Sequence, residues 1–86
     1  MENMDTGAED MVLRIKEIMV SKLGLQENQL IQEASFSNDL HIDSLDLIEL
    51  HMDLEKEFNI TIPDEEGEKL TTVGSVINYI NRKVTH

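Results

Sequence analysis

Ser44 is the residue whose type and position most clearly suggest chemistry, because it stands at the start of a strongly amphipathic segment. The unpaired backbone N–H groups and the dipole at the start of a helix favour negative charge, so a phosphodiester on the Ser44 oxygen would be well placed. Asp43 as the helix cap would leave the Ser44 hydroxyl free for a modifying enzyme, whereas Ser44 as the cap would engage it. Local sequence favours Ser44 as the cap, since serine is among the commonest caps, but leaves both arrangements open.

Other kinds of reactive centre find little support in the sequence. His41 lies three residues before Ser44 and would be the base of a serine hydrolase, but no third orienting group and no G-x-S-x-G pattern accompany the pair. The absence of cysteine excludes thiolate nucleophiles and cysteine-based metal sites. No segment has the alternating carboxylates, central glycine and final glutamate of a calcium loop. We therefore expect no catalytic residues and no metal, and any thiol must come from an attached group.

The segment from Ser44 to Phe58 is predicted to be a helix with two apolar faces. At about 100° per residue, one stripe formed by Leu47, Leu50, Leu54 and Phe58 can face the core. Leu45, Ile48 and Met52 fall on the opposite side among carboxylates. Single exposed apolar residues are common, but a cluster with an acidic surround favours a docking surface for a partner with basic residues around an apolar groove. Its expected contact residues are Leu45, Asp46, Ile48, Glu49, Met52, Asp53 and Glu55.

Three further helices are expected around this one. Apolar residues at three- and four-residue spacing predict a helix from Asp10 to Leu23. Residues 63–66 read Pro-Asp-Glu-Glu, which is typical of the first turn of a short helix, and Gly67 keeps that helix weak. A last helix is capped by Thr71 or Thr72 and ends around residues 82–83.

Two segments have no helical pattern. Residues 1–9 are expected to be a flexible N-terminal extension, so that the domain comprises residues 10–86. Residues 25–42 are expected to form a long ordered connection, pinned to the core by Leu30, Ile31, Phe36 and Leu40. Loops longer than about 12 to 15 residues are unusual in a small domain and are often functional.

The composition limits the fold and the partners. A chain of 86 residues suits one domain, and 40% hydrophobic with only 3% aromatic residues predicts an aliphatic core. The net charge of -11 repels nucleic acid and attracts basic protein surfaces. No apolar run reaches the roughly 18 residues that a membrane span needs, and the acidic start does not resemble a targeting peptide. We therefore expect a cytoplasmic monomer that binds no nucleic acid.

The sequence resembles that of acyl carrier proteins of the type II fatty-acid-synthase kind. Residues 43–46, Asp-Ser-Leu-Asp, are similar to the Asp-Ser-Leu motif whose serine carries phosphopantetheine in that family. The resemblance spans residues 10–82. Its other parts are Ala34-Ser35-Phe36, Asp39-Leu40, Glu49-Leu50, Glu57-Phe58, the run from Ile62 to Glu66, and Tyr79-Ile80-Asn81.

The resemblance implies an all-α bundle of four helices with a long first loop and a short third helix. It implies that Ser44, next to Asp43, carries 4'-phosphopantetheine, and that acyl groups held there as thioesters pass between enzymes of fatty acid biosynthesis. The implied partners are a phosphopantetheinyl transferase, acyltransferases and ketosynthases, which would meet the docking surface defined above. The acyl chain would lie among residues that are equally interpretable as plain core: Phe36, Leu40, Leu47, His51, Leu54 and Leu70.

Several residues depart from the family pattern. His41 stands where a glycine is common and either alters the loop before Ser44, contacts the phosphate or, as local sequence favours, is simply solvated. Lys56 interrupts a stretch that is often acidic, and Leu47 and His51 are bulky or polar where smaller or apolar residues are frequent. These departures leave open a specialised polyketide, other acyl or aminoacyl carrier, and a non-carrier acidic binding module.

Overall fold

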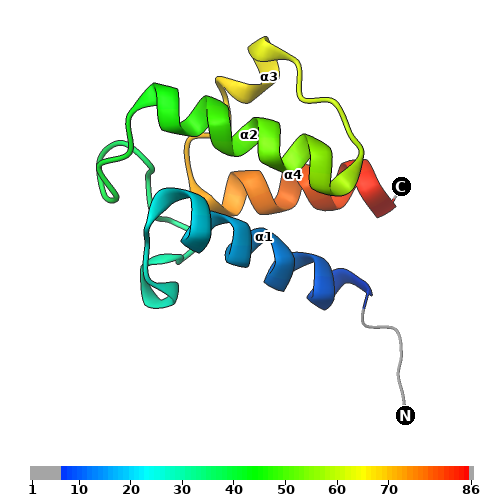
Figure 1. The fold of residues 1–86 in the computed structure, drawn as a ribbon, viewed down its shortest axis with the longest axis horizontal. Helices are drawn as coiled ribbons and strands as arrows, with labels where there is room; N and C mark the ends of the chain where they lie inside the picture. Colours follow the sequence, from blue (N-terminus) through cyan, green and yellow to red (C-terminus); the bar gives the residue numbers. More distant parts are fainter. Residues whose placement is uncertain (1–6, 86) are drawn as a thin grey trace.

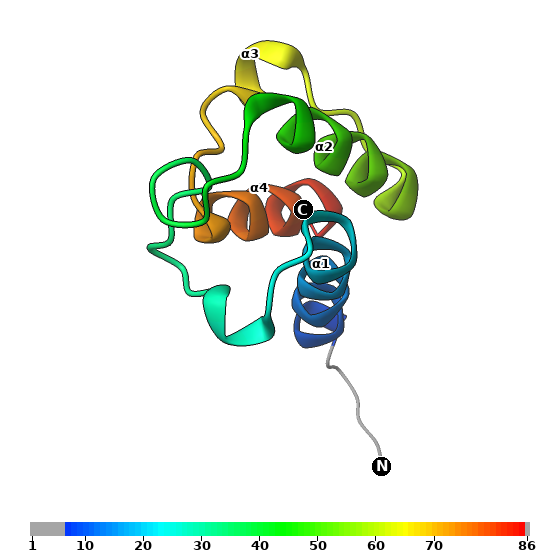
Figure 2. The same ribbon diagram turned by 60° about the vertical axis from the view of Figure 1, so that its left-hand side comes forward.

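The computed structural model of this chain describes residues 7–85, most of which form helices. Its elements are α1 (Gly7–Leu23), the single 3-10 turn η1 (Glu27–Gln29), α2 (Ser44–Phe58), α3 (Asp64–Gly67) and α4 (Val73–Thr85). Figures 1 and 2 show α3 and α1 at opposite sides of the bundle, with α2 and α4 between them. The predicted all-α architecture with a long first loop and a short third helix is confirmed.

The ends of two helices differ from the prediction. α1 begins at Gly7 rather than Asp10, so part of the proposed N-terminal extension is helical, while residues 1–6 lie outside the described part. α4 continues to Thr85, beyond the predicted end at residues 82–83. The spacing of apolar residues does not define where a helix ends, because the polar residues at its ends are compatible with both helix and loop.

The core is aliphatic, as the composition predicted. α1 packs against both α2 and α4, and the apolar stripes of the three long helices meet between them. Burying these stripes is the main stabilising contribution in so small a domain. The largest fully buried side chains are Phe36, Ile15, Met19, Leu50, Leu54, Ile80, Val73 and Val76.

The long loop is held against the start of α4 by backbone hydrogen bonds. Phe36 N donates to Thr71 O, and Val73 N donates to Ala34 O, both at 3.0 Å. Gly74 N donates to Gln32 O at 3.0 Å, and a Cβ on Gly74 would lie only 3.0 Å from that same oxygen, so the close approach requires glycine. In Figure 1 the long loop and the starts of α2 and α4 gather at one end of the bundle.

Three of the four apolar residues expected to pin this loop are buried. Leu30, Phe36 and Leu40 belong to the core, but the prediction for Ile31 is wrong, because that side chain is 58% exposed. Ala34 N donates to Ile31 O, so Ile31 starts a tight turn whose other end, Ala34, takes the inward position. A turn does not repeat at helical spacing, so sequence periodicity gave no guide to its inner side.

Thr72 caps α4. Ser75 N donates to Thr72 Oγ1 at 3.2 Å, and Thr72 N donates to Ser75 Oγ at 3.0 Å. This reciprocal pair satisfies two backbone donors at the helix start. The choice between Thr71 and Thr72 that the sequence left open is therefore decided for Thr72.

Candidate functional site

The start of α2 is capped by Asp43. The Asp43 backbone is extended (φ −85°, ψ 171°), and its Oδ1 accepts a hydrogen bond from Asp46 N at 3.0 Å. Ser44 is the first helical residue and is exposed, and no described residue forms a hydrogen bond with its hydroxyl. The structure thus has the arrangement that local sequence disfavoured, and it leaves the Ser44 oxygen available for modification.

The loop that leads to Ser44 passes through His41, which has a positive φ of 57°. This left-handed conformation is the one that glycine adopts freely, so the backbone here suits the glycine that the resemblance leads one to expect at this position. For histidine it costs on the order of 1 to 3 kcal/mol. The neighbouring residues anchor the loop: Leu40 and Ile42 are buried, and Ile42 N donates to Phe36 O at 2.7 Å. The loop conformation is therefore kept in spite of His41.

A groove of about 720 Å³ runs between α2 and α3 and has Ser44 at its edge. Three of the six residues expected to form an acyl pocket line it, namely Leu47, His51 and Leu70. The other three belong to the packed core: Phe36 and Leu54 are fully buried and Leu40 nearly so, and none of them lines the groove. The complete lining is Ser44, Leu47, Ile48, His51, Met52, Glu55, Ile62, Pro63, Asp64, Gly67, Glu68, Leu70 and Thr71.

The far wall of this groove is α3, which is held in place by two carboxylates. Glu55 Oε2 accepts a hydrogen bond from Ile62 N at 2.6 Å, which fixes the segment before α3 to α2. Glu66 on α3 accepts a hydrogen bond from the hydroxyl of Tyr79 on α4. Burial and, second, the hydrogen bond to Glu66 raise the pKa of Tyr79 to about 12, so this hydroxyl stays protonated and donates at neutral pH.

His51 is the one histidine in the groove lining, and its environment is unusual. The ring is half-buried, and its Nε2 atom is buried without a hydrogen-bond partner among residues 7–85. Burial lowers the pKa of His51 below 6.5, and the nearby Glu55 carboxylate opposes this only in part. The imidazole is therefore neutral at physiological pH.

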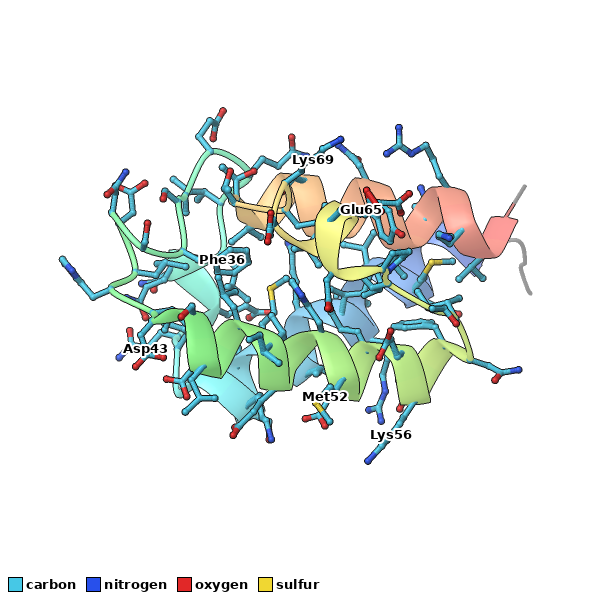
Figure 3. All side chains as sticks on the ribbon, turned by 90° about the horizontal axis from the view of Figure 1, so that it is seen from above. Phe36, Asp43, Met52, Lys56, Glu65 and Lys69 are labelled. Atoms are coloured by element: carbon cyan, nitrogen blue, oxygen red, sulfur yellow. The ribbon has the colours of Figure 1, made fainter. Side chains whose placement is uncertain are left out.

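The expected docking surface is exposed in its apolar part. Leu45, Ile48 and Met52 are 63%, 54% and 50% exposed, and Met52 extends away from the bundle (Figure 3). Two of them, Ile48 and Met52, also line the groove, so docking surface and groove adjoin each other.

The carboxylates around this surface differ in their partners. Asp46 is exposed, and its side chain has no ion-pair partner among the described residues. Glu49 and Asp53 lie 3.8 and 3.4 Å from Lys22 Nζ on α1, and Glu55 is engaged with the α3 segment. The ion pairs of Lys22 could not be predicted from the sequence, because they join residues that are far apart in the chain.

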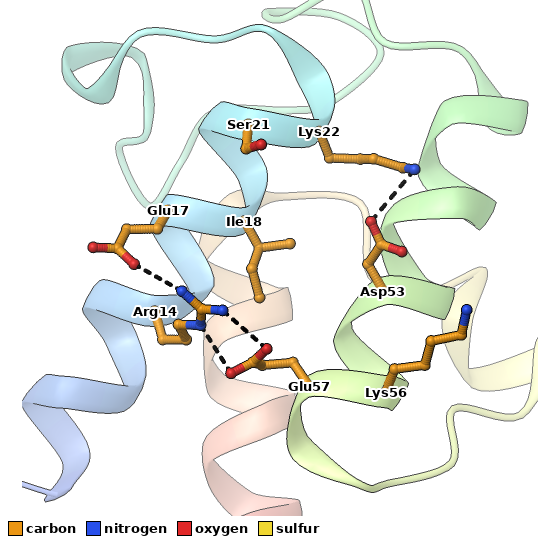
Figure 4. Close-up of a pocket in the computed structure, with 8 residues that line it drawn as sticks. All are labelled: Arg14, Glu17, Ile18, Ser21, Lys22, Asp53, Lys56 and Glu57. Atoms are coloured by element: carbon orange, nitrogen blue, oxygen red, sulfur yellow. Dashed lines mark hydrogen bonds and ion pairs between the residues drawn. The ribbon is translucent and has the colours of Figure 1, made fainter.

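A second, polar hollow lies between α1 and α2, away from Ser44 (Figure 4). Arg14 binds Glu57 through two hydrogen bonds, Nε–Oε2 at 2.8 Å and Nη2–Oε1 at 3.1 Å, and also contacts Glu17 at 3.2 Å. The guanidinium holds the pKa of Glu57 below its usual value. The lining of the hollow is Arg14, Glu17, Ile18, Ser21, Lys22, Asp53, Lys56 and Glu57. Arg14 forms ion pairs there with Glu17 and Glu57, and Lys22 forms one with Asp53.

Metal binding and membrane insertion find no support in the described residues. In the part of the chain that the structure describes, no group of three or more histidine or acidic side chains is placed to hold a metal ion. Within that same part, no helix has the length and apolar character needed to cross a bilayer.

The comparison with known families gives a match over most of the chain. The family model described as "phosphopantetheine attachment site" matches residues 13–80, a range that includes the whole groove and Ser44. The geometry fits such a group, because an exposed serine hydroxyl, without a hydrogen bond to any described residue, stands at a helix start and lines a mainly apolar groove. The chain belongs to the family of phosphopantetheine-bearing carrier proteins, which carry substrates for other enzymes and are not themselves catalysts.

Proposed function

We propose that Ser44 carries the 4'-phosphopantetheine group and that the protein delivers acyl intermediates, held on that group, to enzymes of fatty acid biosynthesis. The observation that carries this proposal is the free, exposed Ser44 hydroxyl at the edge of the α2–α3 groove. When bound, phosphopantetheine supplies the thiol on which an acyl group is held as a thioester, and the chain itself has no cysteine that would compete.

The residues around Ser44 support attachment in three ways. Asp43 takes the capping role, so the serine oxygen is not engaged by the helix. The start of α2 favours the negative charge of a phosphodiester. Leu47, Ile62 and Leu70 offer an apolar lining that would keep an acyl chain out of water.

The docking surface is proposed to meet the partner enzymes. A carrier of this family works with a phosphopantetheinyl transferase and with synthase enzymes. We propose that Leu45, Ile48 and Met52 supply the contact area, and that Asp46 together with the net charge of -11 steers basic partner surfaces to it. Such charges repel other copies of the chain, which supports a monomer, and we propose that this monomer acts in the cytoplasm.

A specialised carrier, for polyketides or other acyl groups, is the second candidate. Its support is the polar imidazole of His51 in the groove lining, because a saturated acyl chain is best accommodated by apolar side chains. Elongation assays with purified fatty-acid-synthase enzymes separate the two candidates. Efficient loading and extension to long saturated chains would support fatty acid biosynthesis, and loading without extension would favour the specialised pathway.

Intact mass spectrometry tests the attachment site. The protein is incubated with coenzyme A and a broad-specificity phosphopantetheinyl transferase, alongside Ser44→Ala and the matched control Ser37→Ala, which alters another exposed serine. We expect one added phosphopantetheine on the wild type and on Ser37→Ala, and none on Ser44→Ala. Addition to Ser44→Ala, or none to the folded wild type, would reject Ser44 as the site.

A further inference from the structure

Met52 is the one exposed methionine among residues 7–85. Its side chain is 50% exposed and extends away from the bundle (Figure 3), whereas Met11 and Met19 belong to the core and are 9% and 0% exposed. The chain has no cysteine, so methionine is the only sulfur that the polypeptide itself offers to an oxidant. Because the oxidation of sulfur side chains follows their exposure, Met52 is the preferred target within the described part of the chain.

Met52 also lies where a change of polarity has consequences. It shares one exposed face of α2 with Leu45 and Ile48, and it lines the groove that has Ser44 at its edge. Methionine suits a shallow contact of this kind, because its flexible and polarisable side chain adapts to different partners. One of the three apolar contact residues of the proposed docking surface is therefore open to oxidation.

The charges around Met52 select the kind of oxidant. On a helix the residues three and four positions away are neighbours, and for Met52 these include Glu49 and Glu55 but only one cation, Lys56. Together with the net charge of -11, these carboxylates repel an anionic oxidant such as the hypochlorite anion. Hydrogen peroxide is small and uncharged, so it reaches this surface without such repulsion.

We infer that Met52 is a reversible oxidation site, and that its conversion to the sulfoxide by hydrogen peroxide weakens the docking of partner enzymes. The sulfur lone pair attacks one peroxide oxygen, so that an S–O bond forms, the O–O bond breaks and one molecule of water leaves. The thioether is thereby oxidised and the peroxide is reduced. A methionine sulfoxide reductase reverses the change, because the sulfoxide oxygen leaves as water while two thiols of the reductant form a disulfide.

The sulfoxide acts on docking through its polarity. Its oxygen is a hydrogen-bond acceptor that water satisfies on the free carrier, and an apolar partner groove would have to strip that water without replacing the hydrogen bond. The fold is spared, because half of the side chain is already in solvent. This inference rests on the proposed function, since Met52 has this role only if enzymes that act at Ser44 dock on that surface.

The test measures the transfer of phosphopantetheine to the whole apo protein before and after oxidation. Wild type, Met52→Leu and Met11→Leu are treated with hydrogen peroxide, catalase removes the excess, and peptide mass mapping locates each added oxygen. The kcat/KM for each carrier is then measured with coenzyme A and a broad-specificity phosphopantetheinyl transferase. Each treated form is compared with its own untreated sample, so that the effect of the substitution itself cancels.

We expect Met52 to gain oxygen before Met11 and Met19 do. The kcat/KM of oxidised wild type is expected to fall about fivefold or more, the loss that follows when one important contact of an interface is removed. Met52→Leu retains the other four methionines and is expected to keep the rate of its untreated sample, whereas Met11→Leu is expected to lose rate as the wild type does. Methionine sulfoxide reductase with dithiothreitol is expected to restore the rate.

Equal losses of rate in wild type and Met52→Leu would overturn the inference, and so would complete oxidation of Met52 without a change in rate. Urea unfolding of the oxidised wild type separates lost docking from damage to the fold. An unchanged midpoint is expected, and unfolding of the oxidised protein under the assay conditions would overturn the inference. Absence of transfer to the untreated wild type would instead reject the proposed function itself, a result that is seen before any peroxide is added.

Discussion

The two sides of α2 are built in opposite ways. The side that faces α1, called the closed side below, packs against that helix, and most of the charges in the polar hollow there are paired, with Arg14 bound to Glu57 and Lys22 close to Asp53 (Figure 4). The side that faces α3 is open: it holds the groove, exposes Ile48 and leaves a histidine nitrogen without a partner among the described residues. The comparison supports the proposal that α2 is a structural element on one side and a binding surface on the other.

The same comparison explains why neighbouring carboxylates have different roles. Asp46 is exposed at the first turn of α2, where a partner can reach it. Asp53 is paired with Lys22, and Glu55 holds the segment that leads into α3. A substitution at Asp46 should therefore affect the proposed docking more than the fold, whereas a substitution at Glu55 should affect both the groove and the fold.

The largest expected effect is the loss of stability when a buried residue of α2 is shortened. Leu54 is fully buried, so Leu54→Ala should lower the free energy of unfolding by about 2 to 5 kcal/mol, through lost burial and the cavity left behind. Met52 is half-exposed on the open side, and Met52→Ala should lower it by less than about 1 kcal/mol. Urea unfolding followed by circular dichroism measures both. Similar losses for the two variants would mean that the open side is as tightly packed as the closed one.

A smaller effect should follow from loosening the wall of the groove. Tyr79→Phe removes the hydrogen bond to Glu66 that ties α3 to α4, and should cost about 1 kcal/mol. Hydrogen exchange of the amides of residues 66–70 should speed up more than that of α1. Uniform acceleration throughout the protein would show instead that α3 is not a separately held element.

The two ends of α2 allow a prediction about backbone strain. His41 before the helix and Asn59 after it both have positive φ, 57° and 56°, but Asn59 is the left-handed cap that ends α2, a position where asparagine recurs in proteins. His41→Gly should relieve strain and, after the entropy cost of glycine, stabilise the fold by about 0.5 to 1 kcal/mol. Asn59→Gly should change the stability less. The midpoints of urea unfolding compare the stability of the two variants. Destabilisation by His41→Gly would show that the backbone at His41 is not strained.

The smallest expected effect concerns pH and the buried imidazole. Because the pKa of His51 is lowered in the folded state, the unfolded chain binds a proton at about pH 6 that the folded chain does not. The contribution of His51 to stability therefore falls as pH drops below 6.5. Relative to His51→Leu, the wild type should lose stability when urea unfolding is repeated at about pH 5.5 instead of about pH 7.5. The comparison with the variant cancels the titration of the other groups, and an unchanged difference would mean that His51 is not desolvated.

Much of the fold could be predicted from the sequence, because the helices follow from local rules. The three- and four-residue spacing of Met11, Ile15 and Met19, and the two faces of α2, are properties of single segments. The short α3 follows from a proline and three acidic residues at its start. The predicted exposure of Leu45, Ile48 and Met52 also agrees with the structure.

The composition of the site was harder to predict, because it depends on contacts between distant segments. Aspartate and serine are both common caps, so the sequence left the choice open, and the hydrogen bond from Asp46 N to Asp43 shows that Asp43 has that role. Apolar character does not distinguish a groove wall such as Leu70 from a core residue such as Phe36. The close approach of His51 on α2 to Gly67 on α3 also could not be predicted, because the spacing of residues within either helix does not show which residues of the two helices meet.

The central claim is that the open side of α2 holds the cargo and the closed side does not. Nitrogen-15 spectra of the holo and octanoyl forms test it most directly, by mapping which backbone amides change on acylation. The account predicts changes at Leu47, Ile62 and Leu70 in the groove and little change at Ile18 and Lys22 between α1 and α2. Changes concentrated at Ile18 and Lys22, with the groove amides unaffected, would contradict it.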